Sequence, residues 1–249
     1  MKPDNSGAFS FQPVGIIRSC FTKKFGIPRQ AGLVREVSAV IELLPPCNNE
    51  QVIRGLEGFS HIWVLFIFHD SMEEGWKNMV RPPRLGGKKR VGVFASRSPF
   101  RPNPIGISAV KLERIETSRG KLSLHIKGAD LMNGTPVVDI KPYLPYADAI
   151  PDATGGYALE EPEPRFEVLI TGNAKSCCEE EEDSGHKGLS SLIVSILNTD
   201  PRPAYYSAKH DGASFGLTLW DMDFKWTVEG DKIIVSDVEK LKTKSQDSV

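Results

Sequence analysis

The segment SRSPFRPNPIG, residues 96–106, combines side chains that can bind a ligand with a stiff backbone. Arg97 and Arg101 supply positive charge, and the amide of Asn103 offers both hydrogen-bond donors and an acceptor. Its prolines fix φ and push the residues before them out of the helical region. Such a segment has little conformational entropy to lose on binding. Taken by itself, a Pro-rich loop is more often a rigid connector.

This segment lies in a longer basic run. Residues 81–112 contain no Asp or Glu, although the whole chain has a net charge of −1. A local concentration of cations attracts phosphate groups, and the alternative is a solvated basic face paired with acids elsewhere. The basic residues of this run are Arg81, Arg84, Lys88, Lys89, Arg90, Arg97, Arg101 and Lys111.

Two further segments carry polar side chains next to predicted strands. In FGIPRQAG, Arg29 has the geometry to clamp a carboxylate, and Gln30 can hydrogen-bond a sugar or a base. His69 and Asp70 follow an apolar strand, at a strand end where binding groups often lie. The plainer interpretations are an exposed loop and a structural histidine.

Two later positions carry weaker signals. Asp139 can position an amine or a ribose, or it can pair with one of the many arginines. Arg202 and Tyr205 lie in DPRPAYYSAKH, a combination that suits unstacked RNA bases but is also common in ordinary packing. The chain lacks His/Cys spacing for a metal, the G-x-S-x-G of a hydrolase and the glycine-rich dinucleotide fingerprint.

The elements that must position these residues are mostly strands. Short β-branched or alternating segments, separated by turn signals, predict a closed barrel or a sandwich in the first ~145 residues. One helix is predicted within residues 48–59, with Asn48 or Asn49 as its N-cap. The predicted strands cover residues 14–19, 33–43, 60–70, 91–96, 107–116, 121–130 and 135–143, with strict alternation over 121–127.

The composition changes after this region. Residues 146–167 are rich in Pro, Gly and acids and predict a linker, and the acidic stretch at 177–185 predicts a surface loop. Residues 188–200 have helical apolar spacing, and residues 215–228 and 232–238 predict strands joined by a tight turn. The predicted fold is therefore mainly β, with an N-terminal barrel and a small C-terminal α+β domain.

Overall composition favours a globular protein of the cytoplasm. The chain has 249 residues, 40% of them hydrophobic, which is enough for a sizeable core. Its 4 cysteines lack a CxxC pair, as expected in a reducing compartment. The longest apolar run, residues 62–68, is far shorter than a membrane span, and the N-terminus does not read as a signal peptide.

Several longer motifs resemble a known family. PRQAGLV, GLEGFSHIWVLFIFHD, VRPPRLGG, GVFASRSPFRPNPIGIS and NGTPVVDIKPYLPYAD occur in the order found in the TsaA-like family, over roughly residues 12–150. Within that family, the chain resembles the bacterial tRNA methyltransferase type, whose second domain also resembles residues 151–241. The resemblance implies flexible ends at 1–11 and 242–249, a catalytic β-barrel at 12–150 and a C-terminal domain that assists tRNA binding.

The resemblance also implies a reaction. It is the S-adenosylmethionine-dependent methylation of the exocyclic amine of a threonylcarbamoylated adenosine, 3′ of the anticodon in threonine-accepting tRNA. A homodimer with the cofactor pocket near the subunit interface is implied as well, and no metal is expected. The alternatives are a non-catalytic cofactor-sensing or RNA-binding module on the same barrel, and a methyltransferase for a small molecule.

Site residues follow from the motifs. Asn103 is our first hypothesis for the group that orients the amine, and Asp139 is the second. Asp70 stands where the family has Gln, and Asn133 where it has Asp. The residues expected at the cofactor are Pro28, Arg29, Gln30, His69, Asp70, Arg97, Ile107, Leu131, Met132, Asn133, Gly134 and Thr135. Those expected at the RNA are Arg81, Arg84, Lys88, Lys89, Arg90, Arg101, Arg202 and Tyr205.

Overall fold

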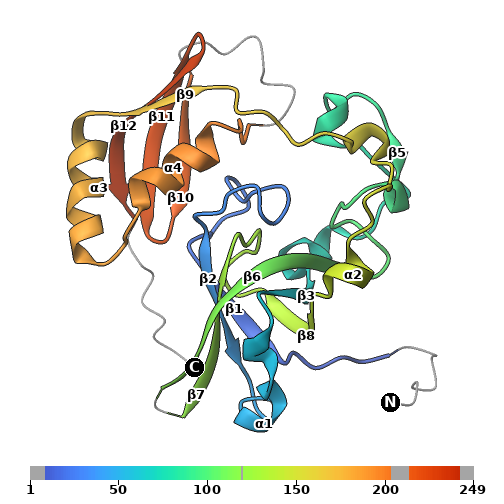
Figure 1. The fold of residues 1–249 in the computed structure, drawn as a ribbon. Helices are drawn as coiled ribbons and strands as arrows, with labels where there is room; N and C mark the ends of the chain where they lie inside the picture. Colours follow the sequence, from blue (N-terminus) through green and yellow to red (C-terminus); the bar gives the residue numbers. More distant parts are fainter. Residues whose placement is uncertain (1–8, 119, 203–212, 242–249) are drawn as a thin grey trace.

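The computed structural model describes residues 9–118, 120–202 and 213–241. Its first part is a closed barrel in which every neighbouring pair of strands is antiparallel, in the order β1-β2-β7-β6-β3-β8 (Figure 1). The strands are β1 (Gly15–Ser19), β2 (Ser38–Leu43), β3 (His61–Ile67), β6 (Ile105–Ser118), β7 (Lys121–Lys127) and β8 (Pro136–Pro142). The predicted mainly β fold with an N-terminal barrel is confirmed.

Alternating side chains fill the barrel. Burial along β3 and β7 changes at every residue, and Ile62, Leu124 and Ile126 are fully buried. The period of two that marks these segments in the sequence is therefore the alternation between the barrel interior and its outer face.

The antiparallel register decides which loops meet. β1, β3 and β7 end, and β2, β6 and β8 begin, at the same end of the barrel. The loops 20–37, 68–104 and 128–135 therefore share one mouth of the barrel. This is the end to which most of the candidate site residues belong.

The first mouth loop is longer than the sequence predicts. β2 begins at Ser38 rather than at residue 33, because the preceding residues cross the mouth instead of joining the sheet. The Gly32 amide donates to the Gly128 carbonyl, and the Gly128 amide donates to the Val37 carbonyl, each at 2.8 Å. These bonds fix loop 20–37 against the end of β7.

The long loop between β3 and β6 forms a lobe at one side of the mouth (Figure 1). The predicted strand at 91–96 is wrong, since only its first two residues pair with β4 and the next three form a 3₁₀ turn. That turn closes through Ser96, whose amide and hydroxyl both donate to the Val93 carbonyl. The lobe contains η2 (His69–Glu74), β4 (Met79–Val80), η3 (Pro83–Leu85), β5 (Val91–Gly92) and η4 (Val93–Ala95).

A short helix precedes β3. The predicted helix is present as α1 (Glu50–Ile53), followed by η1 (Leu56–Gly58). Asn49 is its N-cap, and its side chain accepts a hydrogen bond from the Gln51 amide at 3.1 Å.

The C-terminal part is a four-stranded sheet in the order β10-β11-β12-β9, with two helices against it (Figure 1). The predicted helix and the strand at 232–238 are confirmed, and every apolar residue expected on the core face of α4 is buried. The segment predicted as one strand at 215–228 is instead two antiparallel strands, because the chain turns at Trp220 and Asp221. The elements are β9 (Glu167–Ile170), α3 (Gly172–Ser184), α4 (Leu189–Leu197), β10 (Ser214–Leu219), β11 (Met222–Glu229) and β12 (Lys232–Lys240).

The acidic stretch at 177–185 is not a surface loop as predicted. Most of it belongs to α3, which buries Ala174 and Cys178 against β12. Glu181 further joins the helix to the sheet through an ion pair with Lys240 at 2.8 Å. Glu182 accepts a hydrogen bond from the Ser190 amide of α4 at 2.8 Å, and Glu179, Glu180 and Asp183 are exposed, where a charge run costs little.

The mouth loop also touches the C-terminal sheet. The Trp220 amide donates to the Cys20 carbonyl at 2.7 Å, and the Thr22 hydroxyl donates to the Trp220 carbonyl at 3.1 Å. The connecting chain contains α2 (Pro145–Asp148) and η5 (Gly156–Ala158) and runs from β8 past the lobe to β9 (Figure 1). Within the described ranges, no helix is long and apolar enough to cross a membrane.

Candidate active site

Residues far apart in the sequence meet at the mouth of the barrel. The Arg97 guanidinium, from the lobe, donates to the side-chain oxygen of Gln30, from the first mouth loop. The Ala31 backbone amide hydrogen-bonds the Asp130 carboxylate, which follows β7. Three of the predicted cofactor segments are therefore neighbours, although the sequence separates them by 30 residues or more.

Asp130 is a site residue that the sequence reasoning missed. The Ser108 hydroxyl donates to Asp130 Oδ1 at 2.6 Å. Burial raises the pKa of the Asp130 carboxyl, and the Ser108 hydroxyl, backbone amides and the charge of Arg97 oppose this shift. A carboxylate that is desolvated yet held by donors is typical of a binding or catalytic position. Its place directly before the predicted Leu131–Thr135 turn was the available signal.

The Leu131–Thr135 turn is anchored to β1. The Ser19 hydroxyl donates to the Leu131 carbonyl at 2.7 Å, and the Gly134 amide donates to the Ile17 carbonyl at 2.8 Å. Gly134 has φ +82, which favours glycine. Leu131 and Thr135 are buried, whereas Met132, Asn133 and Gly134 are half-buried at the mouth.

His69 and Asp70 lie at the same mouth. The Phe68 amide donates to the Pro104 carbonyl at 2.8 Å, which places His69 beside the proline-rich segment. The carboxylate of Asp70 pairs with the Lys24 ammonium at 3.0 Å. Asp70 is thus a partly exposed acid whose charge is balanced by Lys24 of loop 20–37. The Gln that the family has at this position could accept a hydrogen bond from the same ammonium.

The Arg29 side chain, predicted to clamp a carboxylate, instead reaches backbone carbonyls of the C-terminal part. Its Nη2 lies 3.5 Å from the Asp200 carbonyl oxygen and 3.2 Å from that of Arg202. Burial is the main cause that lowers the pKa of Arg29. Arg29 therefore joins the mouth loop to the C-terminal part, and Pro28 lines a small pocket of about 50 Å³ at the same junction.

The two catalytic candidates lie in different environments. Asn103 is exposed on the proline-rich segment, and its carbonyl accepts from the Ile105 amide at 2.7 Å. Asp139 shares an outward-facing row with Leu65 and Ile107 on three adjacent strands, and it pairs with Lys141 at 2.7 Å. Ile107 itself is 52% exposed, an unusual position for a large apolar side chain.

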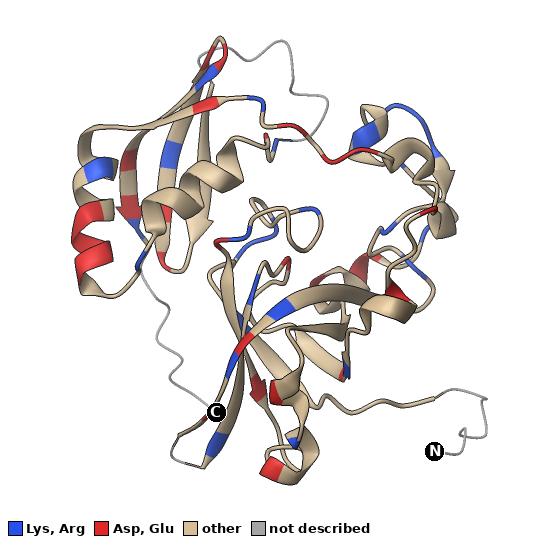
Figure 2. Cartoon of the chain, viewed as in Figure 1, with Lys and Arg blue, Asp and Glu red and all other residues tan. Residues whose placement is uncertain are grey.

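The basic residues of the lobe are accessible. Arg81, Lys88, Lys89 and Arg90 are exposed and form no salt bridge with another described residue. Figure 2 shows Lys and Arg positions along the backbone of the lobe. Arg84 is exposed as well and donates to the Glu160 carbonyl. The lobe therefore presents unneutralised positive charge to solvent.

Arg101 has a different environment. Its guanidinium donates to the Ser96 carbonyl at 2.7 Å and to the Val93 carbonyl at 3.3 Å, so it braces the turn at 93–96. It also lies 5.5 Å from the centre of the Phe94 ring. Phe94 is 77% exposed, and the sequence reasoning did not single it out.

The prediction that Arg202 contacts RNA does not fit the structure. Arg202 is 5% exposed, and its guanidinium binds both carboxylate oxygens of Asp200, at 2.7 and 3.1 Å. The Arg202 guanidinium also lies 5.3 Å from the centre of the Phe166 ring and 5.7 Å from the centre of the Phe215 ring, which completes its buried environment. Tyr205 lies outside the described residues.

Similarity to known proteins covers both parts of the chain. Residues 16–149 match the tRNA-methyltransferase O N-terminal domain, and residues 163–241 match the TrmO C-terminal domain. The chain is 44% identical over 221 residues to the tRNA (adenine(37)-N6)-methyltransferase of Escherichia coli K12, covering 89% of this chain and 94% of that protein. It is 45% identical over 217 residues to a putative S-adenosylmethionine-dependent methyltransferase, RcsF, of Pseudomonas aeruginosa PAO1, with 87% and 91% covered.

Solved structures agree with these matches. The crystal structure of TrmO from Pseudomonas aeruginosa superposes with a TM-score of 0.76 at 38% identity, covering 93% of this chain and 99% of that one. At this identity and coverage, both the barrel and the C-terminal sheet have counterparts. The chain therefore belongs to the TrmO family of tRNA methyltransferases.

Proposed function

We propose that this protein is an S-adenosylmethionine-dependent tRNA methyltransferase that methylates N6 of adenosine 37. The observation that carries the proposal is the barrel mouth, where Gln30, Arg97 and Asp130 meet beside a basic lobe. The E. coli relative named for this reaction supports it, because the chain spans 94% of that protein.

The residues at the mouth fit the cofactor chemically. S-adenosylmethionine supplies a methyl group activated by a sulfonium sulfur, and it also carries a carboxylate, an ammonium and ribose hydroxyls. Arg97 offers a guanidinium for the carboxylate, and Asp130 offers an acceptor for an ammonium or for hydroxyls. Ile107 and the backbone groups of the 131–135 turn offer apolar and polar edges for a base, and the buried Leu131 anchors that turn. We propose that these groups hold the cofactor.

Positioning is the main catalytic task of the chain. An in-line methyl transfer gains much of its rate from holding donor and acceptor in the reactive orientation. The proline-rich segment suits this task because its backbone is restrained by the Phe68–Pro104 bond and by Arg101. We propose that the Asn103 amide orients the target amine. Asp139 is the second candidate, although its pairing with Lys141 makes it less available.

The lobe supplies the RNA contacts in this proposal. Arg81, Lys88, Lys89 and Arg90 are exposed and form no ion pair with a described residue, so they can neutralise backbone phosphates. A double substitution, Lys88→Ala with Lys89→Ala, is expected to weaken tRNA binding and to reduce its salt dependence. Unchanged affinity and salt slope would remove the lobe from the RNA path.

We further propose that the substrate base carries a threonylcarbamoyl group, in threonine-accepting tRNA of the cytoplasm, and that the protein is a homodimer. The exposed Ile105 and Ile107 beside the cofactor residues support a dimer, because a second copy would cover them. Light scattering during size exclusion gives the mass in solution. Substitution of Ile107 by Glu is expected to shift a dimer to monomer.

Two assays separate this function from its alternative. Transfer of labelled methyl from S-adenosylmethionine to tRNA is expected with the wild-type protein, and more with tRNA that carries the threonylcarbamoyl group. A non-catalytic module would bind the cofactor or RNA without transfer. The Asn103→Ala variant is expected to lose turnover while keeping cofactor affinity, and near-normal turnover would exclude Asn103 from the mechanism.

A further inference from the structure

Several arginines converge where the mouth loop, the lobe and the linker to β9 meet. Arg29 donates to the Asp200 and Arg202 carbonyls, and Arg165 Nη1 lies 3.8 Å from Asp200 Oδ2. Arg84 donates to the carbonyl of Glu160, which lies on the same linker as Arg165. The positive charges of Arg165 and Arg84 both act on Arg29. Three separate segments thus bring guanidinium groups together.

The charges at this place do not balance. Within the described part of the chain, Asp200 is the carboxylate that these arginines contact, and Arg202 already occupies both of its oxygens. Among the described residues, the hydrogen bonds of Arg29 and Arg84 go to carbonyl oxygens, although the charge of Asp200 also acts on Arg29. An excess of guanidinium groups over carboxylates is costly unless an anion or solvent compensates it.

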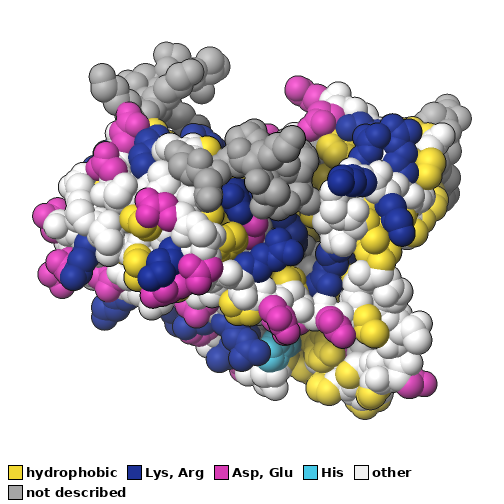
Figure 3. Space-filling view, turned by 90° about the horizontal axis from the view of Figure 1, so that it is seen from above, with side chains coloured by type: hydrophobic (Ala, Val, Ile, Leu, Met, Phe, Trp, Pro, Cys, Tyr) yellow, Lys and Arg dark blue, Asp and Glu magenta, His cyan; other side chains and the backbone are white. Residues whose placement is uncertain are grey.

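The cluster is accessible and adjoins the cofactor residues. The Arg165 side chain is 66% exposed, and Arg84 is exposed as well. Arg29 directly precedes Gln30, which binds Arg97. Figure 3 shows Lys and Arg side chains on this upper face, both on the lobe and between the lobe and the C-terminal part. An RNA strand entering the mouth from the lobe would pass over this face.

We propose that Arg165, with Arg29 and Arg84, forms a binding site for a backbone phosphate of the RNA strand beside the target nucleotide. The proposal builds on the proposed tRNA methyltransferase function. Phosphate oxygens accept hydrogen bonds from planar guanidinium groups, often in pairs, and supply the missing negative charge. The linker at 160–165 thereby becomes part of the RNA path rather than a passive connection between the two parts.

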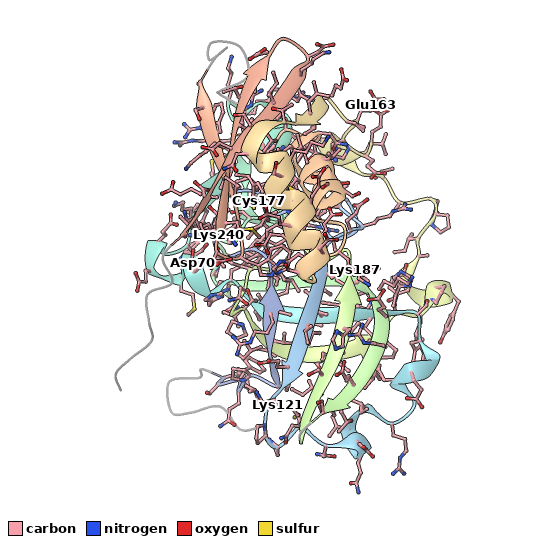
Figure 4. All side chains as sticks on the ribbon, turned by 90° about the vertical axis from the view of Figure 1, so that its left-hand side faces the viewer. Asp70, Lys121, Glu163, Cys177, Lys187 and Lys240 are labelled. Carbon is pink, nitrogen blue, oxygen red and sulfur yellow. The ribbon has the colours of Figure 1, made fainter. Side chains whose placement is uncertain are left out.

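Arg165 is the residue to test, because it is exposed and its loss leaves the Asp200–Arg202 pair intact. We compare Arg165→Gln with Arg165→Lys, and use Lys121→Gln as the control for loss of one exposed cation. Lys121 lies at the end of the barrel opposite the mouth (Figure 4). The measurements are the dissociation constant for tRNA over a series of salt concentrations, cofactor affinity, and methyl transfer by the wild type.

The expected result for Arg165→Gln is a rise of about 5- to 20-fold in the tRNA dissociation constant. The slope of log affinity against log salt should shrink by about 0.7–0.9, which is the loss of roughly one phosphate contact. Arg165→Lys should retain the slope, and Lys121→Gln should match the wild type. Cofactor affinity should not change in any variant.

Two results would overturn the phosphate site. One is an Arg165→Gln variant with wild-type tRNA affinity, or with weakened affinity but an unchanged salt slope. The other is a loss of cofactor affinity, which would assign Arg165 to the cofactor pocket instead. Absence of methyl transfer by the wild type would refute the proposed function itself, so the two failures are distinct.

Discussion

Replacing Asp130 by Asn tests the site at its most informative residue. The substitution keeps the shape and one acceptor oxygen for the Ser108 hydroxyl, 2.6 Å away, but removes the negative charge. If the carboxylate holds the cofactor, its charge-assisted hydrogen bonds are worth about 1.5–3 kcal/mol. The affinity for S-adenosylmethionine should therefore fall about 10- to 100-fold.

Stability should change in the opposite direction. Burial raises the pKa of the Asp130 carboxyl in the folded protein, so the folded state holds its proton more tightly than the unfolded state does. The stability contributed by this group consequently decreases as the pH rises above the unfolded-state pKa and through the folded-state pKa. Asp130→Asn should therefore be at least as stable as the wild type, with an advantage that grows with pH.

Calorimetry for cofactor binding and thermal unfolding at several pH values measure both effects. Asp130→Ala is the contrasting variant, because it leaves the Ser108 hydroxyl and the Ala31 amide without their acceptor and should lower the melting temperature. An Asp130→Asn protein that binds the cofactor as tightly as the wild type would refute the assignment. A purely structural role would instead give a loss of stability with unchanged cofactor affinity.

Two further predictions concern the lobe and the core. Phe94→Ala should weaken tRNA binding about 5- to 100-fold if the exposed ring stacks on a base, while Phe94→Trp retains binding and neither changes the melting temperature. A dimer that dissociates on Phe94→Ala would show that the ring packs against a second subunit instead. Burial raises the pKa of the Cys20 thiol to about 12. Between the ordinary thiol pKa and that value only the unfolded state loses the proton, so stability should fall by about 1.4 kcal/mol per pH unit. Cys20→Ala should remove this slope in denaturant unfolding at alkaline pH, and an unchanged slope would contradict the burial argument.

Local patterns predicted most of the fold. The alternation along β7 and the helical spacing in α4 reflect burial on one side, which the sequence displays directly. Helix α3 escaped prediction because only Ala174 and Cys178 are buried in it. An amphipathic pattern this weak does not stand out from an acidic loop.

The sequence predicted which segments form the site, but it did not predict how their side chains are arranged. The mouth loops follow from motifs, but the direction of a long side chain depends on tertiary neighbours. Arg29 reaches the C-terminal part because loop 20–37 docks against residues 200–202, where Arg202 is buried on Asp200. Asp130 acquires its character only when Ser108, from another strand, is brought within 2.6 Å. The Arg29 and Ser108–Asp130 contacts join residues far apart in sequence, whereas the Arg202–Asp200 pair is local.

The measurement that tests the central claim most directly is mass spectrometry of tRNA nucleosides after incubation with the protein and labelled S-adenosylmethionine. The predicted result is one labelled methyl group on N6 of adenosine 37, which disappears with the Asp130→Asn variant at cofactor concentrations that saturate only the wild type. Unlabelled tRNA in the presence of bound cofactor, or label on a different nucleoside, would contradict the proposed function.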